Sequence, residues 1–261
     1  MTLRGLALSF CLLFIPFTAQ SQQVAVQNPQ AVALAAKALA ALSGPTAVND
    51  ITLTGTATRT AGSDIESGTV VLKALAGSYS RMDLSLSNDA RHEVRNLSPN
   101  SVPQGYWIAS DGSQQPFLLH NCMTDAAWFA PQLTVLSQLS NPNLVASYVD
   151  QENRGEATVQ HLHFAFQSAS PDPTGLFQGL SAEEVYLDAS TFLPVAVAFN
   201  AHPDNDASIN IAVEIDFSDY QSVNGALVPF RIQKFINNGL VLDLTINSAK
   251  INQGLTAADF S

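Results

Sequence analysis

The chain has 261 residues, of which 46% are hydrophobic and only 13% are charged. Its 22 Asp and Glu side chains against 11 Lys and Arg give a formal net charge of −11 at pH 7. The apolar content excludes an intrinsically disordered chain, and the excess of acidic groups argues against binding to nucleic-acid phosphates. No shift in composition divides the sequence, so we expect one domain large enough to build its own core.

The N-terminal segment is typical of a secretory signal peptide. Arg4 supplies the positive start, an apolar run extends from Leu6 to Phe17, and the small Ser21 ends a segment suited to a signal peptidase. The apolar run is too short to span a bilayer, which takes about 20 residues. We therefore predict a signal peptide over residues 1–21 and a periplasmic mature chain of residues 22–261 without a transmembrane segment.

Cleavage at that position leaves a single cysteine, Cys122, because Cys11 belongs to the signal peptide. One cysteine cannot form an internal disulfide bond. We interpret Cys122 as a small buried residue at the start of a helix. The alternatives are a nucleophile and a cysteine that pairs with another chain.

Residues 29–43 are predicted to form the clearest helix. Asn28 can cap the first turn, Pro29 suits the first helical position, and Gly44 followed by Pro45 ends the helix. One apolar stripe is formed by Val32, Ala35, Ala36, Leu39 and Leu42, and its alanines make it thin. We therefore expect the helix to lie close against a sheet.

Much of the remaining chain alternates between apolar and polar residues with a period of two. The alternation is clearest over residues 51–59, 82–86, 209–217 and 242–246. Such alternation is typical of antiparallel strands with one buried face and one solvated face. Asn224-Gly225 and Asn238-Gly239 separate three consecutive runs and suit tight hairpin turns. The last third of the chain is therefore predicted to be an up-and-down meander.

Loops rich in Pro and Ser flank residues 121–140, which we predict to be a helical insert that Pro131 splits or kinks. Trp128 and Phe129 lie in this insert and either cover a ligand or pack against the sheet. With about ten strands, the predicted fold is mainly β (α+β). It is a curled antiparallel half-barrel with the N-terminal helix and the insert as lids.

The inward side chains of such a sheet either mesh into a solid core or line a cavity beneath the lids. In the second case they would form a site for a small apolar ligand. The candidate lining residues are Leu84, Leu86, Trp128, Phe129, Ile211, Val213, Ile215, Phe230, Ile232, Leu242, Leu244 and Ile246. Arg81 and Arg231, two of the few cations on strands, would either meet an anionic head group at the rim or pair with neighbouring carboxylates.

Several short motifs follow the signal peptide and the helix in a fixed order. They are Gly68-Thr69-Val70-Val71-Leu72, Ser80-Arg81-Met82-Asp83, Trp107-Ile108-Ala109-Ser110-Asp111-Gly112, Tyr186-Leu187-Asp188, Leu193-Pro194, Phe217-Ser218-Asp219-Tyr220, Val223-Asn224-Gly225 and Val228-Pro229-Phe230. This arrangement resembles the LolA/LolB-like family of periplasmic lipoprotein carriers, over most of the mature chain and most densely over 183–261. The resemblance implies a half-open barrel whose cavity accepts acyl chains, with no catalytic residues. The chain is longer than the carriers of known role and lacks the lipid-anchoring cysteine of the membrane-bound branch.

Motifs that carry chemistry are scarce. His161 and His163 are two residues apart on a predicted strand, so both rings point to one face and could bind the same metal ion. The sequence places no third ligand, so a solvated pair is the simpler interpretation, and we predict neither a metal site nor a cofactor. The run Asp204-Asn205-Asp206 has the oxygen spacing of a weak calcium loop, but a polar hairpin turn explains it better.

Three functional hypotheses follow, in this order. The first is a non-enzymatic periplasmic carrier that shields the acyl chains of a lipid or a lipidated protein. The second is an envelope protein-interaction module with a solid core, whose partners are other envelope proteins. The third is a metal-dependent periplasmic enzyme that uses His161 and His163. A cavity wide enough for a hydrocarbon chain separates the first hypothesis from the second.

Overall fold

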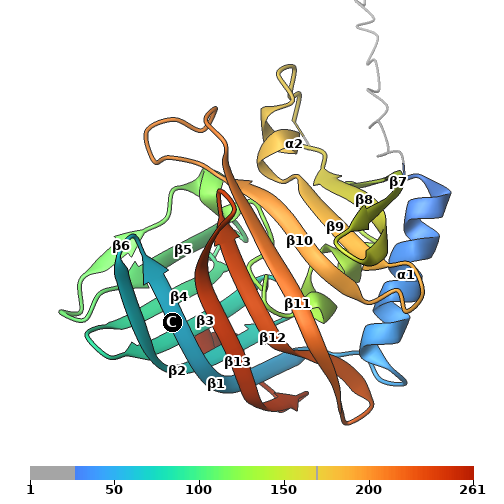
Figure 1. Cartoon of the computed structure of the whole chain (residues 1–261). Coiled ribbons are helices and arrows are strands. Elements are labelled where there is room, and N and C mark those ends of the chain that lie inside the picture. Colours follow the sequence, from blue (N-terminus) through green and yellow to red (C-terminus); the bar gives the residue numbers. More distant parts are fainter. Residues whose placement is uncertain (1–26, 169) are drawn as a thin grey trace, which may run out of the picture.

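The computed structural model describes residues 27–168 and 170–261, which form one antiparallel sheet of 13 strands with few helices (Figure 1). The predicted signal peptide, its cleavage site and Cys11 lie outside the described residues. The strands are β1 (Asp50–Ala61), β2 (Asp64–Leu75), β3 (Tyr79–Leu86), β4 (Ala90–Leu97), β5 (Pro103–Ile108), β6 (Gln114–Pro116), β7 (Leu144–Arg154), β8 (Ala157–Phe166), β9 (Glu183–Asp188), β10 (Pro194–Ala201), β11 (Ile211–Val223), β12 (Ala226–Ile236) and β13 (Gly239–Ile251). The helices are α1 (Pro29–Ser43), α2 (Leu176–Leu180) and the 3-10 helices η1 (Leu119–Cys122), η2 (Pro131–Leu133), η3 (Val135–Gln138) and η4 (Ala257–Phe260).

The sheet is built from two meanders that meet at one seam. Its strand order is β6-β5-β4-β3-β2-β1-β13-β12-β11-β10-β9-β8-β7, so β1–β6 form one meander and β7–β13 the other. The pairing of β1 with β13 joins them. The sheet curls but does not close, and its edge strands are β6 and β7. The predicted mainly β half-barrel with an N-terminal helix is therefore confirmed; the prediction of about ten strands missed short ones such as β6.

The last meander has the predicted up-and-down form. Asn224 and Gly225 form the turn between β11 and β12, as expected. The next turn lies one residue earlier than predicted, at Asn237 and Asn238, which both have positive φ. Two asparagines therefore supply the backbone conformation that a tight hairpin turn requires.

Glycine at position 55 helps the sheet to bend at the seam. The pairing of β1 with β13 shifts register between Thr54 and Gly55. A Cβ atom at Gly55 would clash with the carbonyl oxygen of Thr245 on β13. A residue without a side chain at this bulge thus lets the two strands approach closely.

Helix α1 lies on the concave face of the sheet, where it packs against β7, β12, η2 and η3. The buried face of the helix consists of Ala31, Ala35, Ala38 and Leu42, so it is rotated from the predicted stripe: Ala36 is exposed, and Val32 and Leu39 are only half-buried. The small alanines of this face still let the helix lie close against the sheet, as predicted. The helix ends at Gly44, whose φ is 62°. A Cβ atom there would clash with the carbonyl oxygen of Gly225, so the end of the helix is fitted to the β11–β12 turn.

The cap of α1 offers a first test of the local structure. The Asn28 side-chain oxygen accepts hydrogen bonds from the backbone N–H groups of Gln30 at 2.9 Å and Ala31 at 3.1 Å. Replacing Asn28 with alanine leaves these donors without that partner and is expected to lower the free energy of unfolding by about 1 kcal/mol. Urea denaturation measures the change. An unaltered midpoint would show that the cap contributes nothing to stability.

The predicted helical insert forms a different structure. Its residues form the short 3-10 helices η1, η2 and η3 rather than an α-helix. Pro131 begins η2, because proline cannot donate the hydrogen bond that a helix interior needs. The Thr134 hydroxyl bonds back to the Pro131 carbonyl at 2.9 Å, and the Asp125 carboxylate accepts from the Val135 N–H at 2.6 Å. These local bonds satisfy the backbone without a continuous helix.

The middle of the insert also fills part of the concave side instead of only covering it. Phe129 and Leu136 are at most 1% exposed, and Trp128 is 3% exposed. All three belong to the hydrophobic core together with the inward residues of the sheet. The rings of Trp128 and Phe129 contact each other edge to face, with centroids 5.4 Å apart.

Candidate ligand cavity

Two cavities lie at the end of the concave face where the β1–β2 and β12–β13 hairpins turn. The first has a volume of about 400 Å³ and the second about 450 Å³. They adjoin, because both are lined by Glu93, Trp107, Phe117, Lys234 and Ile236. Each volume falls within the range of about 300–1,000 Å³ that is typical of small-molecule sites.

The wall of the first cavity is mainly apolar. Alternation along β3 directs Met82 and Leu84 to the concave face, and the paired strand β4 directs Glu93 there. From the other meander, β13 contributes Val241 and Leu242. Both meanders therefore build this cavity, and it spans the β1–β13 seam.

Charged side chains gather at the same cavity. Arg59, Arg91 and Lys234 line it together with one carboxylate, Glu93. Arg59 forms a salt bridge of 3.3 Å with Glu66, which is opposite it in the β1–β2 pairing. The Arg91 Nε atom lies 3.3 Å from an oxygen of Asp89.

Lys234 lies between the two cavities, since it lines both. Its ammonium nitrogen is 4.8 Å from the centroid of the Trp128 ring, which is a cation–π contact. Among the described residues no carboxylate forms a salt bridge with it. Burial lowers the pKa of Lys234, and the nearby charge of Glu93 only partly opposes this effect.

The second cavity is more polar, and the insert forms part of its wall. Asn121, Thr124 and Trp128 contribute from the insert, while Val213 and Phe199 come from β11 and β10. Cys122 lies beside these residues but is buried, and burial raises the pKa of its thiol. The prediction that Cys122 is buried is therefore confirmed, but Cys122 ends η1 rather than starting a helix.

A buried pair of carboxyl groups fixes the insert to the sheet next to the second cavity. The Asp125 N–H donates to Glu183 Oε1 at 2.5 Å, while Glu183 Oε2 has no hydrogen-bond partner. Burial raises the pKa of Asp125 to about 6. Burial and the charge of Asp125 raise the pKa of Glu183 well above its usual value. Both shifts favour the protonated form of the pair over its charged form.

The predicted lining residues occupy three kinds of position. Leu84 and Leu242 line the first cavity, and Trp128 and Val213 line the second. The hydrophobic core holds Phe129, Ile215, Ile232, Leu244 and Ile246, with Leu86 and Phe230 packed partly buried against it. Ile211 is half-buried at the start of β11. Most of the predicted residues thus pack together, and four of them line the two adjoining cavities.

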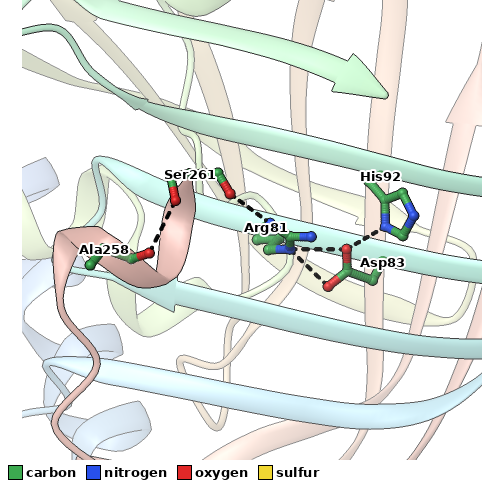
Figure 2. Close-up of polar contacts among 5 residues, drawn as sticks. All are labelled: Arg81, Asp83, His92, Ala258 and Ser261. Atoms are coloured by element: carbon green, nitrogen blue, oxygen red, sulfur yellow. Dashed lines mark hydrogen bonds and ion pairs between the residues drawn. The ribbon is translucent and has the colours of Figure 1, made fainter. Parts of the chain in front are cut away.

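The two predicted rim cations have carboxylate partners, which was the alternative left open for them. Figure 2 shows Arg81 bonded through its Nε atom to both oxygens of Asp83, at 3.0 and 2.9 Å. Arg81 also donates to the Ser261 carbonyl at 2.9 Å. Burial opposes ionisation of Asp83, but Arg81 and His92 outweigh it and hold the pKa of Asp83 below its usual value. Arg231 pairs with Asp243 through a single contact, from one terminal guanidinium nitrogen to one carboxylate oxygen at 2.5 Å.

His161 and His163 are joined by one carboxylate. His161 Nε2 and His163 Nδ1 each lie 2.8 Å from an oxygen of Glu184 on the neighbouring strand β9. The hydrogen bond that His163 donates to the Glu184 carboxylate raises the pKa of His163. Within residues 27–168 and 170–261, no group of three or more His, Cys, Asp and Glu side chains is arranged to hold a metal ion.

The cations of the first cavity were missed by the sequence interpretation, although β12 carries a signal for one of them. Lys234 is in phase with Phe230 and Ile232, so the same alternation that predicts an inward face places this lysine on it. Asp125 and Glu183 are far apart in the sequence, and no local pattern predicts their contact.

These features define an open antiparallel half-barrel with a ligand-sized cavity at one end. The sequence matches no protein-family model and no curated protein sequence. Among solved structures, a domain from Vibrio parahaemolyticus described as an outer membrane lipoprotein-sorting domain is similar, with a TM-score of 0.57 and 13% identity over 89% of this chain and 96% of that one. A DUF1329 family protein from Desulfovibrio piger has a TM-score of 0.54 and 9% identity over 89% and 96% of the two chains.

A LolA superfamily protein from Nitrosomonas europaea is similar over 88% of this chain and 97% of that one, with 11% identity and a TM-score of 0.48. The chain has a LolA-like fold, as the motif order predicts. In the part of the chain that the structure describes, no helix is both long and apolar enough to cross a bilayer.

Proposed function

We propose that this chain is a non-enzymatic periplasmic binding protein or carrier that shields acyl chains of a lipid or a lipidated protein in the first cavity. The observation that carries the proposal is the cavity itself: apolar side chains from both meanders enclose about 400 Å³ at one end of the half-barrel. Apolar walls with a few polar groups are typical of sites that bind rather than transform a ligand.

The energetics of hydrocarbon burial support this role. Each CH₂ group moved out of water contributes about 0.8 kcal/mol, so a chain of a dozen carbons contributes about 10 kcal/mol before the cost of ordering it. Exposed apolar side chains also surround the end that holds the cavity. Ile65, Trp107 and Leu240 are 68%, 37% and 37% exposed there, and they offer an apolar path between the cavity and the surface.

The proposed location and partners rest on two further observations. The N-terminal sequence is typical of an exported protein. The similar Vibrio parahaemolyticus domain is described by its role in outer membrane lipoprotein sorting. We therefore place the chain in the periplasm, with a lipid or lipidated protein as ligand and envelope proteins as possible partners.

Filling the first cavity tests the proposal directly. Met82→Trp puts a bulky ring into the cavity, and excluding two CH₂ groups of a ligand costs about 1.6 kcal/mol, which is more than tenfold in affinity. We expect this variant to bind a fluorescent fatty acid at least tenfold more weakly than the native protein. Ser85→Trp is the matched control, because Ser85 is exposed on the same strand and does not line the cavity.

Native mass spectrometry of protein purified from a periplasmic extract gives an independent readout. The proposal predicts a co-purifying species with the mass of a lipid, which Met82→Trp reduces and Ser85→Trp does not. No co-purifying lipid, together with no displacement of the fluorescent fatty acid by any lipid, would contradict the carrier function. An interaction module with a solid core would then be the better explanation.

A further inference from the structure

The first cavity concentrates positive charge in an acidic protein. The whole chain has 22 acidic and 11 basic side chains, a ratio of two to one. Among the Lys, Arg, Asp and Glu residues that line this cavity the balance is reversed, with Arg59, Arg91 and Lys234 against Glu93. Such a local excess of cations beside apolar walls complements a ligand that is both apolar and negatively charged.

Lys234 is the cation of this cavity for which the structure shows no salt bridge to a carboxylate among the described residues. Arg59 has Glu66 at 3.3 Å and Arg91 has Asp89 at 3.3 Å, whereas the Lys234 contact that the structure shows is with the Trp128 ring. A partly buried ammonium without a carboxylate partner is costly, which agrees with the lowered pKa of Lys234. An anionic ligand group would supply the missing partner.

We propose that the first cavity selects an amphiphile with a single hydrocarbon chain and an oxyanion head group, a carboxylate or a phosphate, and that Lys234 binds this head group. This inference rests on the proposed function and names the ligand class of the same cavity. The volume of about 400 Å³ lies at the lower end of the range for small-molecule sites, which favours one chain over several. The Met82 and Leu84 side chains line the path on which that chain would lie.

Competition between matched ligands tests the head-group preference. Dodecanoate, dodecyl phosphate and dodecanol share one chain and differ in charge. The experiment measures how strongly each of them displaces a fluorescent fatty acid from the native protein. We expect the two anions to bind at least tenfold more tightly than the alcohol. Acetate and inorganic phosphate, used alone at the same concentrations, should not displace the probe. Displacement by these free anions would show an ion site that is independent of the chain and would overturn the inference.

The role of Lys234 is tested by Lys234→Gln, which removes the charge. We expect this variant to lose most of the tenfold preference for the anions, while its affinity for dodecanol stays within twofold of the native value. Lys250→Gln is the matched control, because Lys250 is exposed on β13 and does not line the cavity. If thermal melting shows that Lys234→Gln folds poorly, Lys234→Met takes its place. Methionine also removes the charge, and its unbranched side chain resembles the hydrocarbon part of lysine.

The outcomes separate this inference from the proposed function. Equal binding of anions and alcohol to the native protein, or an unchanged preference in both Lys234 variants, would overturn the ligand class and leave acyl-chain binding intact. Failure of all three twelve-carbon ligands to displace the probe, with no lipid seen by native mass spectrometry, would contradict both.

Discussion

Replacing Phe129 with alanine is expected to lower the free energy of unfolding by about 3–5 kcal/mol. Phe129 is 1% exposed and belongs to the core between the insert and the sheet. Its removal loses the burial of an aromatic ring and leaves a cavity that the surrounding sheet, held by hydrogen bonds on both sides, closes only in part. Urea denaturation followed by circular dichroism measures the loss.

A matched control lies in η1, directly before the insert. Leu119 is 51% exposed in η1, so Leu119→Ala is expected to change the free energy of unfolding by less than about 0.5 kcal/mol. Similar midpoints for the two variants would mean that the insert is not part of the core. That result would also contradict the idea that the insert limits the cavity to one end of the half-barrel.

The second large effect is a pH dependence that originates in Asp125 and Glu183. Both have a raised pKa in the folded protein, Asp125 to about 6, so folding favours their protonated forms. Their contribution to stability is fully present below the pKa that these carboxyl groups have in the unfolded chain, about 4. It is lost as the pH rises through the pKa values that they have in the folded protein. For Asp125 alone, a rise of the pKa from 3.8 to about 6 corresponds to a loss of roughly 3 kcal/mol in the free energy of unfolding between acid and neutral pH.

Glu183→Gln is therefore expected to stabilise the protein at pH 8 and to flatten the loss of stability between pH 4 and pH 8. The amide keeps an oxygen that accepts from the Asp125 N–H and adds a donor for the Asp125 carboxylate. Urea denaturation at several pH values measures the profile. A profile of the variant parallel to that of the native protein would show that the pair is not the origin of the effect.

The neighbouring residue provides a control of opposite sign. Burial opposes ionisation of Glu184, but hydrogen bonds from His163 and His161 outweigh it and lower the pKa of Glu184. Its carboxylate therefore contributes stability above the unfolded pKa, and that contribution is lost as the pH falls through the folded value. Glu184→Gln should destabilise the protein at pH 7 and have less effect in acid.

Local features of the sequence predict local features of the fold. The cap at Asn28, the end of the helix at Gly44 and the turn at Asn224-Gly225 are each determined by a few adjacent residues, and all three occur as expected. The period-two alternation predicts the inward face of β11, β12 and β13 for the same reason. The insert was predicted to be helical and broken at Pro131; it forms short 3-10 helices, one of which begins at Pro131, because Pro131 and the bonds of Thr134 and Asp125 prevent longer helical segments.

The candidate site is harder to predict, because it depends on contacts between distant residues. Alternation indicates that Leu84 and Ile215 both point inward, but not that Leu84 lines a cavity while Ile215 is packed in the core. That difference depends on where the insert lies. The same holds for the cations of the first cavity. Alternation along β12 predicts that Lys234 lies on the inward face, but only the three-dimensional structure shows that its contact is with the Trp128 ring and not with a carboxylate.

The seam between the two meanders has a consequence for how the chain folds and how it could assemble. Among the described strands, β1–β13 is the pair that is not adjacent in sequence; it brings Ile51 against Ile251, whereas each remaining pair joins two strands that are consecutive along the chain. We expect the hairpins to form early and this long-range register to form late. Two molecules that exchange their first meanders could rebuild the same seam in a swapped dimer. A ligand that contacts Met82 and Leu242 bridges the two meanders. Its binding would therefore stabilise the monomer and slow the exchange.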